Sequence, residues 1–569
     1  MPPAHLDLLL DASMGSFVYL GPVLPVVAAA LVVHLVFKRD ETSTLSRLLG
    51  LLLGVPTCIH VLFSDKSEAI ALGFLKDLAY FYSTLGLSIL LYRLSPWHPI
   101  ARYPGPILCK VSKLYWTAIA RKGQQHRLLA KLHKQYGDIV RIGPNEVSIA
   151  NASAIDPLMG AQGVPKGQSW SGRLPRNALP NLVGIRDKKE HARRRKTWQR
   201  ALNPTSIKYY EGFLSSRTQQ MVDLLAQKVP GPINMSEWMG YYTFDIMGDI
   251  VFGDGPEMMK NGDSNNLWHL LEESQKTLFL FGLVPWLGQL MLQVGKVIPL
   301  LPGITNYRNY TIGRVVERRQ RGSPNRDLFH YLMDDDGVLE DKPTAAEVMS
   351  DSALAIIAGA DTTTSGISSF LYFITRYPKV YQKVQEEVDS LGGDLTSSEK
   401  QAKLTYLNAT INESLRLLPP VQSGSQREVP RGSGVVMIGP YELPEGTAAF
   451  IPFSLVQRDQ RNFSPCPEMF LPERWLSKDL REKLEPDLFN EKVPYRLNQS
   501  AFLPFSYGPA NCVGKQLAYV EMRMAICLLL HRFTLRFAPG YNPSQYEDEF
   551  RDYYIVVKGD LPILLTIRN

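Results

Sequence analysis

Hydrophobic and polar residues are distributed differently in the first 95 residues and in the rest of the chain. Residues 17–37 form a run of 21 residues without a formal charge. At about 1.5 Å per helical residue this run reaches roughly 31 Å, enough to cross a hydrocarbon layer of about 30 Å. Two further apolar runs follow before residue 95. We expect residues 1–95 to be an N-terminal membrane anchor of one to three transmembrane helices, at about 17–37, 48–63 and 69–92.

Two other readings of this region are buried core helices and, for the first run, a cleaved signal peptide. A signal peptide normally opens with basic residues, whereas Asp7 and Asp11 precede the first run. Basic residues follow the first run at Lys38 and Arg39 and the third at Arg93. The positive-inside rule then predicts an N-terminus outside the cytosol and a cytosolic position for everything after residue 92.

Residues 96–106 contain WHPIARYPGP, in which three prolines lie within ten residues. Proline donates no backbone hydrogen bond and biases the residue before it toward extended geometry. We expect a stiff, non-helical hinge between the anchor and a globular part.

Residues 107–569 show no repeat and no low-complexity linker, which indicates one large catalytic domain. Helical periodicity dominates this part, and strand-like runs are short. The expected helices lie at 124–136, 205–225, 266–281, 345–376, 379–391 and 514–533. The expected strands lie within 139–150, 435–439 and 553–557. The predicted fold class is mainly α with small β-sheets, and the basic cluster at 318–326 is expected to be a solvated loop.

Composition excludes several classes of protein. Hydrophobic residues are 45% and charged residues 21%, both near globular averages. The net charge of +7 divides into −1 for residues 1–95 and +8 for the rest, too modest for a nucleic-acid binder. Five scattered cysteines without a CxxC pair indicate neither a disulfide scaffold nor a zinc module.

The segment FLPFSYGPANCVGKQLAYVEMR, residues 502–523, places Cys512 just before a predicted helix. A helix N-terminus and nearby backbone N–H groups favour a thiolate by lowering its pKa. Gly508 and Gly514 leave room for a flat ligand close to the backbone. Phe505 can shield the sulfur from water. The alternative for a lone Cys-x-Gly is a free cysteine at the start of a core helix.

The longest predicted helix, 345–376, contains LAIIAGADTTTSG. Thr344 three residues before Glu347 predicts a capping box at its start. Ala358 and Thr362 are four residues apart and share a face. Asp361 beside Thr362 places a carboxylate and a hydroxyl in mid-helix, which is costly in a buried setting without a purpose.

Glu413 and Arg416 in NESLRLLPP lie three residues apart, and Arg474 follows in FLPERWL. A lone ExxR is common and usually forms a solvated pair worth about 0.3–0.5 kcal/mol. Here the pair follows the long helix, precedes PERW and is followed by Cys512, and this order gives it weight.

Taken in this order, the motifs resemble those of the cytochrome P450 superfamily of haem-thiolate monooxygenases, and they cover nearly all of the chain after residue 104. The resemblance implies that Cys512 is the axial ligand of the iron of haem b. It implies that Asp361 and Thr362 deliver protons during oxygen activation. It further implies that Glu413, Arg416 and Arg474 form a buried structural triad.

The same resemblance implies several haem contacts. His191 and Arg195, four residues apart, correspond to a pair that binds the haem propionates, as does Arg427. Ala358, Phe505, Gly508 and Gly514 would also contact the haem. One position departs from the family pattern, because Ala510 stands where Arg or His usually binds a propionate. Either another cation compensates or the haem is held less tightly.

The implied activity is insertion of one oxygen atom of O₂ into an apolar small molecule, as in the specialised metabolism of microsomal fungal-type members, with terpenoids as an example. The implied partner is an NADPH-dependent cytochrome P450 reductase, with cytochrome b5 as a further electron donor. Arg193, Arg194, Lys196 and Lys515 are candidates for steering that acidic partner. The implied location is the endoplasmic reticulum membrane, with the catalytic domain in the cytosol.

Two alternatives stay open: a thiolate-haem isomerase or dehydratase that uses no O₂, and a membrane protein that binds haem or sterol without turnover. The sequence does not specify the substrate, the position oxidised or the number of oxidation steps. Regions expected to line the substrate cavity are 163–182, 278–286, 358–359 and 421–425.

Overall fold

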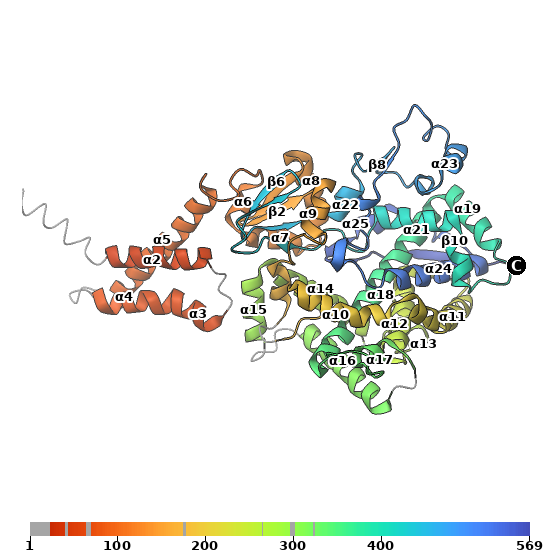
Figure 1. Cartoon of the computed structure of the whole chain (residues 1–569), viewed down its shortest axis with the longest axis horizontal. Coiled ribbons are helices and arrows are strands. Elements are labelled where there is room, and N and C mark those ends of the chain that lie inside the picture. Colours follow the sequence, from red (N-terminus) through yellow and green to blue (C-terminus); the bar gives the residue numbers. More distant parts are fainter. Residues whose placement is uncertain are drawn as a thin grey trace, which may run out of the picture.

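The computed structural model describes residues 23–39, 44–63, 70–174, 178–264, 266–295, 302–322 and 325–568. The N-terminal helices form a bundle that projects from one end of the molecule (Figure 1). They are α2 (Val23–Arg39), α3 (Leu45–Leu49), a π-helical turn (Gly50–Gly54), α4 (Val55–Phe63) and α5 (Ile70–Leu94). Helix α2 packs on α5 through a small apolar core that includes Val26, Ala30 and Phe81.

Two of the three predicted runs meet the length and composition of a transmembrane helix within the described residues. The first predicted run is described only from Val23, and residues 17–22 lie outside the described part. The continuous helical stretch Leu45–Phe63, 19 residues, and Ile70–Leu94, 25 residues, are long and apolar enough to cross a membrane. The run at 48–63, only 16 residues long in the sequence, is extended by the preceding turn.

The segment 96–106 is non-helical, as expected, but it is packed against the globular part. Ile100 and Tyr103 are buried in an apolar cluster. Pro104 accepts a hydrogen bond from the Arg141 backbone N–H at 2.7 Å. A Cβ on Gly105 would lie 2.1 Å from the Arg141 carbonyl oxygen, so only glycine permits this approach.

The remainder is mainly helical with small sheets, which confirms the predicted fold class. The long expected helices are present as α8 (Gln125–Tyr136), α11 (Pro204–Ala226), α14 (Leu267–Leu283), α18 (Ala345–Arg376), α19 (Pro378–Asp389) and α24 (Lys515–Arg532). The capping box of Thr344 and Glu347 starts α18 as predicted. The other helices are α6 (Ile107–Val111), α7 (Lys113–Ala120), α9 (Ile155–Met159), α10 (Lys188–Ala201), α12 (Met235–Phe252), α13 (Met258–Asn261), α15 (Pro285–Val294), α16 (Pro302–Arg321), α17 (Leu328–Met333), α20 (Ser398–Ala402), α21 (Thr405–Leu417), α22 (Phe453–Gln457), α23 (Lys478–Leu484) and α25 (Ser544–Asp548).

The largest sheet has four strands in the order β1-β2-β7-β4, from Ile139–Gly143, Glu146–Ile149, Ala448–Phe450 and Arg427–Glu428. Its β2–β7 pair is parallel, with Val147 opposite Ala449, and its other pairs are antiparallel. A three-stranded sheet joins β10 (Phe533–Phe537), β13 (Pro562–Ile567) and β3 (Pro232–Asn234). Three two-stranded pairs complete the set: β5 (Val435–Ile438) with β6 (Tyr441–Pro444), β8 (Phe463–Ser464) with β9 (Arg496–Leu497), and β11 (Arg551–Tyr553) with β12 (Ile555–Val557).

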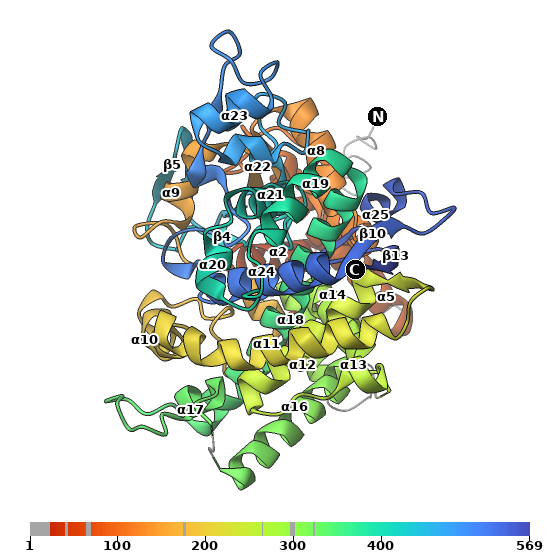
Figure 2. The same cartoon turned by 90° about the vertical axis from the view of Figure 1, so that its right-hand side faces the viewer.

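Helix α18 runs through the centre of the domain (Figure 2), where it contacts α12, α16, α21 and α24. Nearly all of its C-terminal half is buried. Its Gly359 is a contact point, because a Cβ there would lie 2.4 Å from the Met247 sulfur on α12. The helix thereby carries residues 358–362 to the middle of the domain.

One local prediction was wrong and another was right only in part. Arg318, Arg319 and Arg321 of the basic cluster at 318–326 belong to α16, and Arg318 is buried in an ion pair with Asp327 at 2.6 Å. The expected strand at 553–557 is present as β12, but Tyr553 ends β11 and Tyr554 forms the turn between the two strands. Tyr554 has a φ of 80°, a left-handed conformation unusual for a residue other than glycine.

Candidate active site

A cavity of about 380 Å³ lies among α18, α24, the 3₁₀ turn η3 (Gln168–Arg173) and the β11–β12 hairpin. The predicted site residues that line it are His191, Arg195, Ala358, Thr362, Arg427, Phe505, Cys512 and Gly514. Ala510 lines it as well. Gly508, Asp361, Glu413, Arg416 and Arg474 are described but do not line it.

Cys512 lies in the turn that leads into α24, for which Gly514 is the N-terminal capping residue. Its backbone N–H donates to the Phe505 carbonyl at 2.9 Å, which closes the turn around the sulfur. Cys512 has solvent-accessible surface, and it lines the cavity. Burial raises the pKa of its thiol, and the Gly514 backbone N–H, Arg195 and Lys515 offset this only in part. The expected lowering of the pKa by the helix N-terminus is therefore outweighed by desolvation in the protein alone.

The two glycines of this segment have different roles. Gly514 lines the cavity, and the nearest atom to a Cβ there would be the Cys512 sulfur at 3.9 Å. Gly508 has a φ of +69°, and a Cβ there would lie 2.2 Å from the Met159 carbonyl oxygen. Gly508 is thus required by a turn that packs against α9, whereas Gly514 is the glycine that leaves space beside the cavity.

A group of basic side chains gathers at one edge of the cavity: Lys166, His191, Arg195 and Arg427. Burial lowers the pKa of His191 to about 3 and that of Lys166 to about 7, and repulsion from the neighbouring cations adds to both effects. In the described part of the chain, neither Lys166, Arg195 nor Arg427 forms an ion pair with a carboxylate. Several buried cations without an anion are costly unless a ligand supplies the charge.

Their hydrogen bonds go to neutral groups. Lys166 donates to the carbonyls of Leu182 and Val183 at 3.1 and 2.7 Å. Arg195 donates to Asn511. The buried Nε atom of Arg427 has no partner. An orphaned guanidinium atom, several uncompensated cations and a cysteine in one apolar cavity fit a flat, dianionic group such as haem. The lysine at 166 was not singled out from the sequence, because no motif marks it.

The two central residues of α18 face different surroundings. Thr362 lines the cavity, and its hydroxyl donates to the Ala358 carbonyl one turn earlier at 2.5 Å. Asp361 is buried away from the cavity. Its carboxylate accepts hydrogen bonds from Lys558 at 2.8 Å, an ion pair, and from Gln275 at 3.2 Å. Gln275 itself lines the cavity and so connects the two regions.

Glu413, Arg416 and Arg474 meet at one fully buried point, where α21 packs against the 3₁₀ turn η4 (Pro472–Trp475). Both arginines donate to the Glu413 carboxylate at 2.8–2.9 Å. The backbone N–H of Leu471 and the indole of Trp475 also donate to it at 2.9 Å. Burial by itself raises the pKa of Glu413, but Arg416, Arg474 and the hydrogen bonds outweigh it and lower the pKa to about 2.

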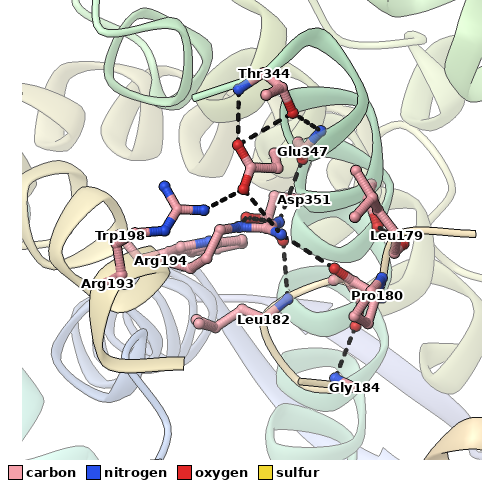
Figure 3. Close-up of polar contacts among 12 residues, drawn as sticks. Leu179, Pro180, Leu182, Gly184, Arg193, Arg194, Trp198, Thr344, Glu347 and Asp351 are labelled. Carbon is pink, nitrogen blue, oxygen red and sulfur yellow. Dashed lines mark hydrogen bonds and ion pairs between the residues drawn. The ribbon is translucent and has the colours of Figure 1, made fainter. Parts of the chain in front are cut away.

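A buried ion pair holds residues 179–184, part of the wall of the cavity, against α10 and α18 (Figure 3). Arg194 on α10 pairs with Asp351 on α18 at 2.5 Å. Asp351 also accepts from the Leu182 backbone N–H at 2.9 Å, and Arg194 donates to the Pro180 carbonyl at 3.2 Å. Arg194 is therefore structural, which corrects its expected place on a surface that steers a partner. Lys196 and Lys515 are exposed.

The regions expected to line the cavity do so. Residues of 163–182, 278–286, 358–359 and 421–425 all contribute to its wall. The sequence reading missed the hairpin residues Tyr553, Tyr554 and Ile555, because they resembled an ordinary strand. Arg173 lies within the expected region 163–182, but the sequence did not single it out because no motif marks that segment. Only its burial distinguishes this arginine from others, and burial can be seen only once the fold is known.

Comparison with known proteins gives a consistent result. The family model described as Cytochrome P450 matches residues 104–566. "Cytochrome P450 monooxygenase nodW" of Hypoxylon pulicicidum is 34% identical over 82% of this chain and 82% of its own length. "Cytochrome P450 monooxygenase FCK2" of Fusarium pseudograminearum is 34% identical over 85% of this chain and 84% of its own length. "Cytochrome P450 67" of Uromyces fabae is 30% identical over 94% and 98%.

Proposed function

The chain belongs to the cytochrome P450 family, and we propose that its central cavity binds haem through Cys512 and an apolar substrate on the side of Thr362. As a member of this family it is a haem-thiolate monooxygenase that receives electrons through a reductase. The observation that carries the proposal is that one cavity is lined by Cys512, by unpaired cations and by the central turn of α18.

Cys512 supplies the thiolate. When bound, haem iron supplies the activation of O₂, and a thiolate ligand favours cleavage of the O–O bond. The chain's part is to hold the sulfur in a closed turn beneath a space that Gly514 leaves free. Since burial raises the thiol pKa in the protein alone, we infer that loss of the proton accompanies metal binding.

The haem propionates are held by Arg195, Arg427 and His191. The neutral imidazole of His191 can donate one hydrogen bond, and the two guanidinium groups supply positive charge. Ala510 lines the cavity but offers no donor. Lys166 lies in the same group of cations and compensates for it.

Thr362 and Asp361 control the supply of protons. The Thr362 hydroxyl is at the cavity surface and can turn from the Ala358 carbonyl toward bound water or oxygen. Asp361 can exchange protons with the cavity only after its ion pair with Lys558 loosens. The triad of Glu413, Arg416 and Arg474 stabilises the fold around the haem.

The substrate is an apolar small molecule of specialised metabolism, and a terpenoid is one such class. Support comes from the predominantly apolar wall, which includes Leu278, Phe279 and Ile357, and from the fungal origin of the similar monooxygenases. Residues 1–95 anchor the protein in the endoplasmic reticulum membrane, and the catalytic domain lies in the cytosol, where it meets NADPH–cytochrome P450 reductase and cytochrome b5. Support is the pair of long apolar helices, with the basic residues Lys38 and Arg39 before the first of them and Arg93 and Arg102 at the end of and after the second.

The test is the optical spectrum of the reduced, CO-bound protein. A strongly red-shifted Soret band is expected for the wild type and should be absent from Cys512→Ala, with Cys466→Ala as the control. A red-shifted band that persisted in Cys512→Ala would refute the ligand assignment. Incorporation of ¹⁸O from ¹⁸O₂ into product, with NADPH and reductase, separates a monooxygenase reaction from an isomerisation or dehydration. Resistance of the membrane-bound protein to alkaline extraction, with digestion of its catalytic domain by protease added outside microsomes, tests the anchor and its orientation.

A further inference from the structure

One cationic side chain of the cavity is left without a role by the haem contacts above. Arg173 lines the cavity, and none of its nitrogen atoms makes a hydrogen bond or ion pair within the described residues. Its Nε atom is completely buried. Burial lowers its pKa to about 10, so the guanidinium is charged at neutral pH. A charge that is desolvated without a partner costs several kcal/mol.

Two aromatic rings lie beside the guanidinium group. Arg173 lies 4.4 Å from the ring centre of Trp170 and 4.9 Å from that of Tyr554. These rings meet edge to face at 5.2 Å, and the Trp170 indole donates to Ser425 at 3.2 Å, which fixes its orientation. Cation–π contacts of this kind stabilise a desolvated positive charge. They occupy none of the guanidinium N–H groups, which are left to donate to a ligand in the cavity.

Close backbone packing fixes the position of Arg173. The turn η3 lies against α14 and α15, and glycines permit the contact from both sides. A Cβ on Gly172 would lie 2.5 Å from the Phe281 carbonyl oxygen. A Cβ on Gly282 would lie 2.7 Å from the Arg173 Nε, and one on Gly288 would lie 2.7 Å from the Gly172 carbonyl oxygen. Arg173 is therefore presented by a rigid wall.

Arg173 has different contacts from the cations assigned to the haem propionates. Lys166 and Arg427 are joined by a backbone bridge, and Arg427 donates to the Val164 carbonyl at 3.3 Å. Arg195 donates to Asn511, next to Cys512. Arg173 instead lies against Trp170, Tyr554 and α14, and the neighbour that it shares with Arg427 is Tyr554.

We propose that Arg173 binds a carboxylate on the substrate, so that this enzyme oxidises apolar skeletons that bear an acid group. This inference rests on the proposed function and narrows its substrate class. A guanidinium edge matches a carboxylate with two parallel hydrogen bonds. The rest of the wall near η3, including Leu174, Leu278 and Phe279, accepts the apolar part. Anchoring the acid at a fixed wall determines which carbon of the skeleton approaches the reactive centre.

The experiment measures binding of matched pairs by isothermal titration calorimetry to the full-length holoenzyme in detergent. The probes are dodecanoate, abietate and C8 to C20 alkanoates, each compared with its methyl ester. We expect at least one acid to bind the wild type 10-fold or more tightly than its ester. In Arg173→Met the two should bind within twofold, and Arg173→Lys should keep part of the preference. Arg536→Met, which removes an exposed charge on β10, should keep all of it.

Equal binding of acid and ester across the panel in the wild type would overturn the inference, as would a preference that persists in Arg173→Met. The haem content of each variant, from the ratio of Soret to protein absorbance, gives an independent outcome. Loss of haem in Arg173→Met with an unchanged preference would make Arg173 a propionate ligand and also overturn it. The spectrum of the reduced, CO-bound form of the same wild-type sample distinguishes failure of the proposed function from failure of this inference. Absence of the red-shifted band refutes the proposed function, whereas a normal band without acid preference refutes this inference alone.

Discussion

Replacing Glu413 with Gln tests whether the buried triad stabilises the catalytic domain. The change removes the carboxylate charge that lies between Arg416 and Arg474. The side chains of all three residues are fully buried. A drop in the Glu413 pKa from 4.5 to about 2 corresponds to about 3 kcal/mol, at about 1.4 kcal/mol for each tenfold change in the dissociation constant. Breaking a buried pair typically costs about 3–5 kcal/mol, which agrees.

The assay is thermal unfolding of the holoenzyme followed by circular dichroism at a fixed scan rate. The unfolding entropy of about 2.1 cal/mol/K per residue gives about 1 kcal/mol per degree for a domain of about 460 residues. Glu413→Gln should therefore melt about 3 °C lower than the wild type at pH 7. The exposed Glu399, whose side chain is 78% accessible in a surface pair with Lys403, supplies the control Glu399→Gln, which should not shift.

The pH dependence of the stability lost in Glu413→Gln provides a second test of the same reasoning. Because the folded pKa of Glu413 is lowered, its stabilisation is complete above about pH 4.5 and is lost as the pH falls toward 2. The deficit of Glu413→Gln should shrink from about 3 kcal/mol at pH 7 to about 2 kcal/mol at pH 3.5. A variant that melts within 1 °C of the wild type at pH 7, or a deficit that grows at acidic pH, would refute the reasoning.

Three further predictions concern the cavity and its surroundings. Burial raises the pKa of Asp552 to about 6, so the free energy of unfolding should fall by about 3 kcal/mol as the pH rises from below 3.8 to above 6. Melting curves of Asp552→Asn should lose this pH dependence, and an unchanged slope would contradict the prediction. Thr362→Ala should release more peroxide per NADPH consumed, whereas Thr364→Ala, whose hydroxyl is buried against Ala360, should not; equal coupling in both would reject the role of Thr362. Lys558→Met should destabilise the protein by about 3–5 kcal/mol, because it leaves Asp361 without its ion-pair partner. The double variant with Asp361→Asn should recover most of the lost stability in melting curves, and additive losses would contradict the proposed ion pair.

Local signals in the sequence were sufficient for much of the fold. The capping box at Thr344 predicted the start of α18 because both of its partners lie within three residues of each other. The spacing of Glu413 and Arg416 on one turn likewise placed them on one face. The segment around Cys512 was recognisable because its turn, its glycines and its helix are contiguous in sequence.

Other features depend on contacts between distant residues and could not be predicted. Arg194 and Arg318 looked like solvated charges because their burial depends on Asp351 and Asp327, which the basic runs do not reveal. Arg173 acquires its meaning only when η3 meets α14 and the β11–β12 hairpin. Tyr554 interrupts a strand-like pattern because Asp552 accepts its backbone N–H at 3.1 Å and stabilises a turn there.

Under the membrane anchoring proposed above, the contacts around Arg141 have a consequence for how the enzyme meets a partner in the same membrane. Arg141 donates to the Arg93 carbonyl at the end of α5, and its backbone is joined to Pro104. A free tether would let the catalytic domain tumble, whereas these contacts set its tilt relative to α5. With α5 in the bilayer as proposed, a partner diffusing in the same bilayer would search in two dimensions and meet the same face at each encounter. Part of the rotational entropy that association normally costs is thereby lost at folding, before the partner arrives.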